Sequence, residues 1–231
     1  MFGQKSHKLR NGFRVLAIAA CAAVCFFAVS GFGREYTSAV MLRGQEKDIV
    51  LGMRAFDPHW LSFSVRGLND LMKNCADLLL ENEMVRLSPQ LQQEIGDSCG
   101  AAAKAVLRRN PGFARALAAG LIAARADVTP EAYALAEQAA PFEPWPLGIR
   151  LLAAERAVPK ATGTLPAALV PLVSSDMGRA MQSDWGRRLL AGLYLRQTGL
   201  RSLIQAVAKS RPVEEQRAFL QATQHLAAAN G

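Results

Sequence analysis

The sequence predicts an all-α protein in which one N-terminal transmembrane helix is followed by an array of helical hairpins. An unbroken apolar run occupies residues 15–33, and the rest of the chain is a series of Ala- and Leu-rich segments separated by prolines. No stretch has the alternating polarity, or the density of Val, Ile and Thr, that is typical of a β-sheet. About 180 residues beyond the apolar run are enough for one hydrophobic core.

The apolar run 15–33 is predicted to be an uncleaved transmembrane signal anchor. It carries no charged residue, and about 20 residues of helix cross the hydrocarbon core of a bilayer. Residues 1–14 form a basic tail that the positive-inside rule keeps in the cytoplasm. We therefore expect a single-pass protein of a bacterial inner membrane, with the C-terminal domain in the periplasm. The basic residues of the tail are Lys5, Lys8, Arg10 and Arg14.

Two other interpretations of this segment stay open. Small residues at Ala28 and Ser30 would allow a signal peptidase to cleave before Gly31. The sequence Ile18-Ala19-Ala20-Cys21 resembles a lipobox, but only six apolar residues precede Cys21 and the run continues well beyond it. A buried helix of a soluble core is disfavoured, because the basic flank is one-sided and the segment has no polar face.

The charge balance argues against a nucleic-acid partner. Four of the 27 Lys and Arg residues precede the apolar run, so from Arg34 onward 23 basic residues stand against 19 acidic ones. This mild excess contains no dense basic cluster interleaved with aromatic residues, which is the usual footprint of nucleic-acid binding.

The remaining chain divides into two parts. Residues 34–65 are predicted to be a connector with short membrane-proximal helices, interrupted at Asp57-Pro58. Residues 66–231 are predicted to be the periplasmic helical-hairpin domain. Ser88-Pro89 and Thr129-Pro130 supply an N-cap followed by a first-turn proline, which marks helix starts. The predicted helices are 66–87, 89–109, 111–126, 130–140, 145–157, 166–175, 184–197, 200–209 and 212–229.

Cys75 and Cys99 are predicted to form a disulfide. They lie in the exported part of the chain, where disulfides persist. Cys75 is 13 residues before Ser88 and Cys99 is 11 residues after it, so an antiparallel hairpin brings them to similar heights. A bridge needs Cα atoms within ~7 Å of each other. Two buried free thiols are the alternative. A redox-active pair is disfavoured, because the spacing is not Cys-x-x-Cys and no His is near. The other pair, Cys21 and Cys25, lies within the apolar run.

Residues 113–146 resemble one tetratricopeptide repeat. Small residues stand at the pattern's eighth, twentieth and twenty-seventh positions, and a proline stands near its thirty-second; they are Gly120, Ala132, Ala139 and Pro144. The aromatic positions of the pattern hold Ala116 and Ala136, and the next unit, 147–180, keeps Ala154 but has Pro166 where alanine is expected. The resemblance implies paired helices that stack into an array.

The sequence holds no recognisable catalytic or metal-binding constellation. Its three histidines, His7, His59 and His225, are far apart and have no ligand at helical spacing. No phosphate-binding loop or nucleophile elbow is present. Glu143, among Pro and aromatic neighbours, is the one carboxylate that could act as a general acid, although a turn-shaping role is favoured for it. We therefore expect no enzyme activity, no cofactor and no metal.

Three sites are candidates for binding a protein partner, since Trp and Arg are enriched at interface hot spots. Each aromatic in them has core packing as its alternative role. The candidate residues are His59, Trp60, Phe142, Trp145, Trp185 and Arg187.

These features predict a non-catalytic periplasmic scaffold, anchored in the inner membrane by one span, that binds a protein partner and organises a membrane-bound assembly. By analogy of layout, that assembly serves extracellular polysaccharide synthesis or export. An adaptor for periplasmic protein maturation, as in cytochrome c assembly, is one alternative. A helical cell-envelope enzyme of lytic transglycosylase type is another, although the catalytic domain's motifs are missing.

Overall fold

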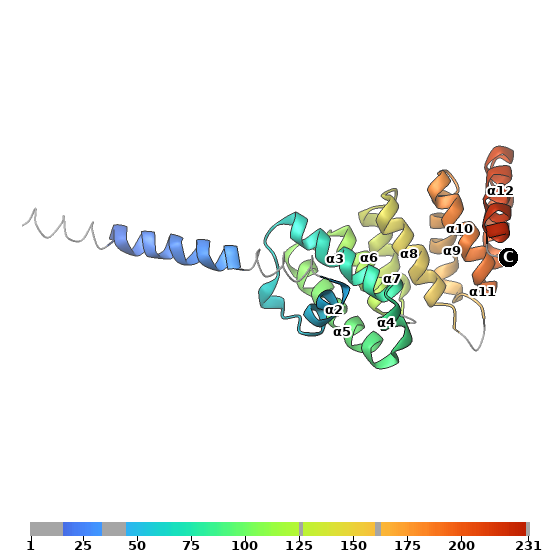
Figure 1. Cartoon of the computed structure of the whole chain (residues 1–231). Coiled ribbons are helices and arrows are strands. Elements are labelled where there is room, and N and C mark those ends of the chain that lie inside the picture. The colour runs from blue at the N-terminus through green and yellow to red at the C-terminus, as the bar shows by residue number, and fades with distance from the viewer. Residues whose placement is uncertain (1–15, 34–44, 125–126, 160–162, 230–231) are drawn as a thin grey trace, which may run out of the picture.

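The computed structural model describes residues 16–33, 45–124, 127–159 and 163–229 (Figure 1). These residues form helices and connecting turns, with no strand among them, which confirms the predicted all-α class. The basic tail 1–14 and residues 34–44 of the predicted connector lie outside the described residues.

The predicted membrane segment is one continuous helix, Leu16–Gly33. Its side chains are exposed except at the partly exposed Ser30, and none of the segment is buried against the rest of the chain. The helix is long and apolar enough to cross a membrane. Cys21 and Cys25 lie on it as free, exposed cysteines.

The helical domain begins within residues 45–65, which the sequence assigned to the connector. Asp57 caps a 3-10 turn by accepting a hydrogen bond from the backbone N–H of His59 at 2.8 Å. The elements in chain order are α2 (Glu46–Arg54), η1 (Pro58–Trp60), α3 (Val65–Leu80), α4 (Glu83–Leu87), α5 (Pro89–Arg109), α6 (Ala114–Ala124), α7 (Pro130–Ala139), α8 (Pro144–Arg156), η2 (Ala167–Leu169), α9 (Val170–Ala180), α10 (Asp184–Arg196), α11 (Thr198–Lys209) and α12 (Val213–Ala229).

Several helix starts follow directly from local chemistry. The Ser88 hydroxyl accepts a hydrogen bond from the N–H of Leu91 at 3.3 Å, and the Thr129 hydroxyl accepts one from Ala132 at 3.2 Å. Each cap is followed by a proline in the first turn, where its missing N–H costs nothing. The predicted starts of α5 and α7 are therefore confirmed.

The prediction of one helix over 66–87 is wrong in one respect, because α3 ends at Leu80 and a second, short helix follows it. The side chain of Asn82 accepts a hydrogen bond from the N–H of Val85 at 2.9 Å and thereby starts α4. Val85 is fully buried, so the helical spacing of apolar residues continues from α3 into α4. The sequence pattern therefore does not reveal where α3 ends.

The predicted helix 166–175 is displaced along the chain. Pro166 precedes the 3-10 turn η2, and α9 begins at Val170 with Pro171 in its first turn. Pro166 therefore precedes a 3-10 turn and not the predicted helix. Pro171 lies in the first turn of the helix, which continues to Ala180.

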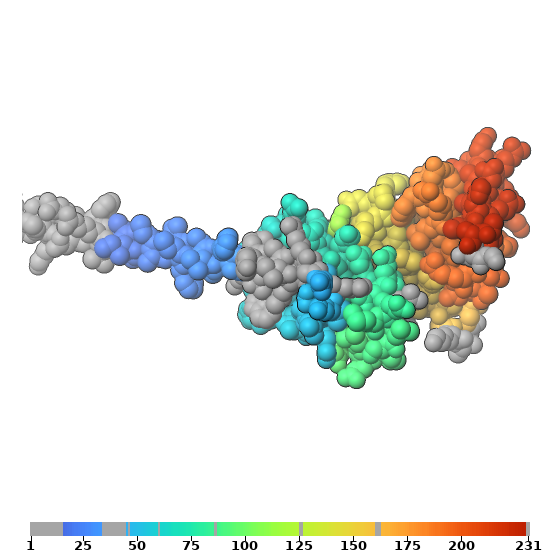
Figure 2. All heavy atoms as spheres, in the orientation of Figure 1, coloured from blue at the N-terminus to red at the C-terminus, as the bar shows by residue number. Residues whose placement is uncertain are grey.

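Most helices pack against their neighbours one and two places along the chain, and in the N-terminal half α2 also packs on α5 and α3 on α6. Among these contacts, α6 packs on α5 and α8, α9 packs on α11, and α10 packs on α12. Figure 2 shows the same order as a continuous change of colour along the body, which ends at α12. One hydrophobic core runs through all of these elements, and α2 contributes Val50 and Met53 to it.

Candidate functional site

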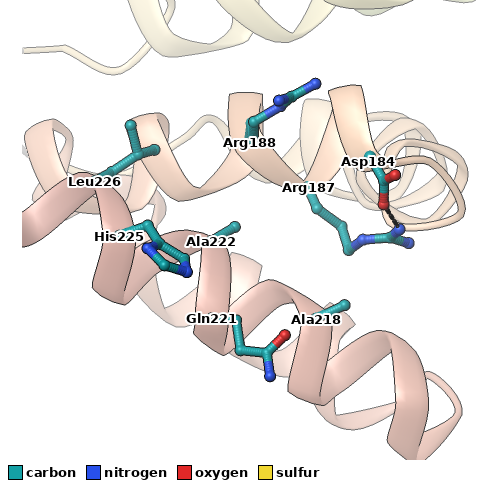
Figure 3. Close-up of a pocket in the computed structure, with 8 residues that line it drawn as sticks. All are labelled: Asp184, Arg187, Arg188, Ala218, Gln221, Ala222, His225 and Leu226. Carbon is teal, nitrogen blue, oxygen red and sulfur yellow. Dashed lines mark hydrogen bonds and ion pairs between the residues drawn. The ribbon is translucent and has the colours of Figure 1, made fainter.

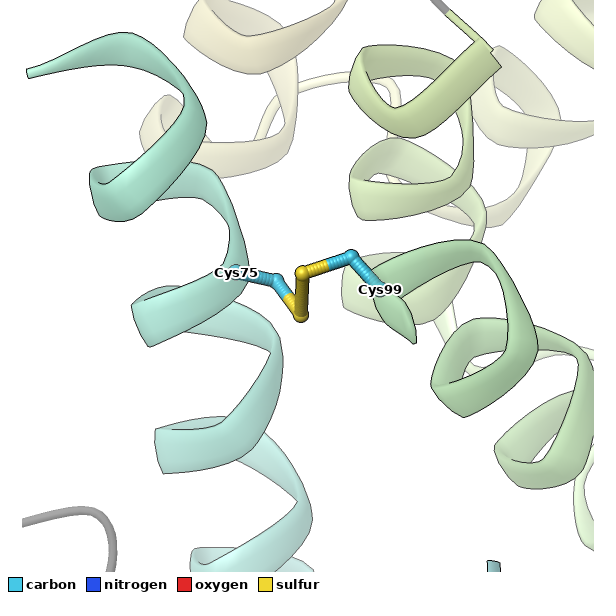
Figure 4. Close-up of a disulfide and its surroundings, with 2 residues drawn as sticks. All are labelled: Cys75 and Cys99. Carbon is cyan, nitrogen blue, oxygen red and sulfur yellow. A yellow bond between two sulfur atoms is a disulfide. The ribbon is translucent and has the colours of Figure 1, made fainter. Parts of the chain in front are cut away.

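The predicted disulfide joins α3 to α5 (Figure 4). Cys75 and Cys99 have Cα atoms 5.6 Å apart, and both side chains are fully buried. The bridge is therefore confirmed, and its burial places it in the core. Burial on both sides of the bridge indicates a structural crosslink between two helices.

A buried ion pair joins α8 to α9. Arg150 and Asp176 are both 0% exposed. Their contact is bidentate: Nε of Arg150 donates to one carboxylate oxygen at 2.7 Å, and its Nη2 donates to the other at 2.9 Å. The remaining donor, Nη1, bonds the backbone carbonyls of Ala136 and Ala140 on and just after α7. The guanidinium is therefore satisfied on every side, as a buried charge must be.

The ion pair extends into a network over three helices. The Tyr133 hydroxyl on α7 donates to Asp176 at 2.8 Å. Arg179 donates to Asp176 at 2.9 Å and to Glu137 at 2.6 Å. Burial, and then the neighbouring Asp176 carboxylate, raise the pKa of the Tyr133 hydroxyl well above its usual value of 10.0. Asp176, Arg150 and Tyr133 cannot be reached by a solute, so we assign the network to holding α7, α8 and α9 together.

An open groove lies between α10 and α12 (Figure 3). Its volume is about 460 Å³. Asp184 pairs with Arg187 at one end, and the guanidinium of Arg187 also donates to the backbone carbonyl of Met181 at 2.6 Å. The residues that line the groove are Asp184, Arg187, Arg188, Ala218, Gln221, Ala222, His225 and Leu226.

Of the predicted partner-binding residues, Arg187 lines this groove, whereas Trp185, also on α10, is not among the lining residues. Trp185 is 36% exposed, and its ring covers Gly148 of α8 so closely that a Cβ there would lie 3.1 Å from the ring. Gly148 therefore lets the indole pack inward.

The other predicted residues lie elsewhere in the domain. Phe142 is 71% exposed and lies 5.6 Å beneath the Arg179 guanidinium. Trp145 is half-buried and lies 5.2 Å from the guanidinium of Arg115. His59 is exposed at the far end of the array. Trp60 ends η1, and its side chain lies outside the described part of the chain.

Glu143 is exposed at the N-cap of α8 and makes no capping hydrogen bond. Among the described residues, no group of three or more His, Cys, Asp or Glu side chains is placed to hold a metal ion. Ala139, which the repeat resemblance places at a packing position, is exposed, while Tyr133 and Ala136 of the same helix are buried.

The sequence interpretation missed two features. One is the buried network, for which the only signal was Arg150 standing among apolar residues of a helix. The other is the pairing of α10 with α12, which places Arg188 and His225 along one groove although they are far apart in sequence.

Comparison with known proteins finds no matching family model, no matching curated protein and no matching solved structure. The residues and geometry described above therefore carry the functional proposal.

Proposed function

We propose that this protein is a non-catalytic scaffold, anchored in a bacterial inner membrane by the helix Leu16–Gly33 and exposing its helical array to the periplasm. The observation that carries the proposal is the pairing of an exposed, apolar, membrane-length helix with a domain crosslinked between α3 and α5. A basic tail before the helix favours a cytoplasmic N-terminus. A disulfide after it is in keeping with the periplasm, because such bridges persist in oxidising compartments.

The domain serves as a tetratricopeptide-like platform for a protein partner. Support comes from the stacking of alternate helices, α6 on α8 and α10 on α12, which resembles a solenoid. Arrays of this kind present extended surfaces to peptides and helices. The polar groups of the buried network are satisfied within the fold, by one another and by backbone carbonyls, so we assign the network to holding helices together.

The assembly that the scaffold organises is the machinery of extracellular polysaccharide synthesis or export. This part of the proposal rests on layout alone, a short basic tail, one span and a helical periplasmic domain. Genes for a polymerase, flippase or exporter beside this gene would support it, whereas haem-lyase genes would favour the cytochrome c alternative.

A topology experiment tests the proposal. A reporter enzyme active only in the periplasm, fused after Gly231, is expected to be active, and the fusion is expected to stay with membranes after a carbonate wash. Photo-crosslinkers placed along the array are then expected to trap a membrane protein. An inactive reporter, or release by carbonate, would contradict the proposed anchor.

A further inference from the structure

The groove between α10 and α12 carries more positive than negative charge. Arg187 and Arg188 lie on α10, and Asp184 is the single acidic residue in the lining. Asp184 is already paired with Arg187. No carboxylate is paired with Arg188 within the described ranges, and Figure 3 shows its side chain extending from α10 on the side away from α12.

The far side of the groove adds polar side chains and an apolar floor. His225 and Gln221 project from α12, and both are exposed. Between the polar groups, Ala218, Ala222 and Leu226 give α12 a surface of low relief. Ala218 and Leu226 are eight positions apart, or about 12 Å of helix at ~1.5 Å per residue, which is enough for about two turns of a third helix lying alongside.

We propose that this groove binds an acidic helical segment of a partner protein. Carboxylates of that segment bond Arg188, with Gln221 and His225 as further donors, and its apolar side chains lie on the alanine floor. The inference deepens the proposed function, on which it rests, by naming the chemistry of the partner. Helix-in-groove docking is a common mode of recognition for helical platforms, and charge complementarity gives it specificity.

Two other anionic partners fit the groove less well. An acidic polysaccharide has no apolar side chains to cover Ala218, Ala222 and Leu226, and the lining contains no Trp, Tyr or Phe ring on which a sugar could stack. An anionic lipid headgroup would have to reach α12, which lies at the opposite end of the array from α2, the element nearest the membrane anchor in sequence (Figure 1). A peptide has neither constraint.

The test uses the full chain in phosphatidylcholine nanodiscs and a fluorescein-labelled, Ala-based helical peptide with Glu at every fourth position. Binding is followed by fluorescence anisotropy, with the Glu-to-Gln version of the peptide as a matched ligand. We expect the Glu peptide to bind, the Gln peptide to bind at least tenfold more weakly, and added salt to weaken the Glu complex.

Three variants locate the site. Arg188→Glu is expected to weaken binding of the Glu peptide by about tenfold or more. Gln221→Arg is expected to tighten binding of the same peptide severalfold. Arg66→Glu, which changes an exposed arginine of α3 at the other end of the array, is expected to change nothing. All three positions are exposed, and circular dichroism verifies that helicity is kept.

Equal binding of the Glu and Gln peptides, or equal effects of Arg188→Glu and Arg66→Glu, would overturn the inference. So would displacement of the peptide by oligogalacturonate or by phosphatidylglycerol vesicles at lower concentration than by unlabelled peptide. The periplasmic reporter separates this failure from that of the scaffold proposal. An active reporter without peptide binding removes only the groove assignment, and peptide binding with an inactive reporter removes only the topology.

Discussion

The two halves of the helical domain hold neighbouring helices together by different chemistry. In the N-terminal half, a covalent bond between Cys75 and Cys99 joins α3 to α5. In the C-terminal half, the ion pair of Arg150 with Asp176 joins α8 to α9, and Tyr133 ties in α7. We call the Cys75–Cys99 disulfide the N-terminal clamp and the Arg150–Asp176 ion pair the C-terminal clamp. Both are fully buried, but different changes weaken them. The disulfide acts largely by restricting the unfolded chain, whereas the ion pair depends on each charge keeping its partner.

This difference has a consequence for how the protein responds to its surroundings. Reduction weakens only the disulfide between α3 and α5, and a pH above 10, where Tyr133 of the unfolded chain loses its proton, weakens only the network around Asp176. An array whose stacking runs from α3 to α12 passes through both clamps in turn. Changes at either clamp are therefore expected to lower the stability of one half before the other.

The largest effect is expected from breaking the ion pair on one side. Asp176→Ala leaves the Arg150 guanidinium buried without a counter-charge, which costs about 3–5 kcal/mol of unfolding free energy. Urea denaturation of the full chain in detergent measures it. The matched control is Glu155→Ala, which removes the more exposed pair of Arg196 with Glu155 and is expected to cost ~1 kcal/mol or less. Comparable losses from the two variants would show that burial does not decide the cost.

The next effect in size concerns the disulfide. Changing both Cys75 and Cys99 to Ala is expected to cost about 2–4 kcal/mol, because the bridge closes a loop of 24-residue separation. Reductant should lower the unfolding midpoint of the natural chain and leave that of the double variant unchanged. An unfolding midpoint of the natural chain that reductant leaves unchanged would show that the disulfide contributes little to stability.

A smaller effect is expected where helices approach closely. A Cβ on Gly186 would lie on the backbone carbonyl of Ala180, so Gly186→Ala forces α9 and α10 apart and costs about 1–3 kcal/mol. Gly120, by contrast, would place its Cβ 3.8 Å from that of Ala103, an ordinary contact. Gly120→Ala is therefore expected to be neutral or slightly stabilising. Thermal melting of the two variants side by side decides between these expectations.

The smallest effect is a pH dependence from Tyr133. Its pKa is raised in the folded chain, so above pH 10 the unfolded state releases the proton that the native state retains. Stability is thus fully present below pH 10 and falls with rising pH above it, by up to about 1.4 kcal/mol per pH unit. Tyr133→Phe, less stable than the natural chain at pH 8, should close that gap above pH 10. A gap that stays constant up to pH 11 would contradict the assignment.

Sequence reasoning predicted the helices whose ends carry their own signals. The cap at Thr129 and the proline after it fix the start of α7 without help from the rest of the fold. The disulfide was predictable for a similar reason, because helix length and the turn at Ser88 set the relative heights of the two cysteines.

What sequence reasoning missed depends on contacts between distant residues. Arg150 and Asp176 are 26 positions apart and read as ordinary charges of amphipathic helices until α8 packs on α9. The break at Asn82 was hidden because the buried Val85 keeps the apolar period intact. The groove exists only because α12 packs on α10. Local patterns therefore specified most elements, and long-range packing specified the groove and the buried clamp.

The most direct test of a membrane-anchored, oxidised periplasmic domain is the intact mass of the protein from cells, after acid quenching, unfolding without reductant and labelling with a thiol reagent. The chain has four cysteines, and two of them, Cys21 and Cys25, lie in the apolar helix Leu16–Gly33. We predict a full-length chain that carries two labels, both on this apolar helix. Four labels would show that Cys75 and Cys99 are not bridged in the cell, and an unlabelled product beginning at Gly31 would show that the helix is a cleaved signal and not an anchor.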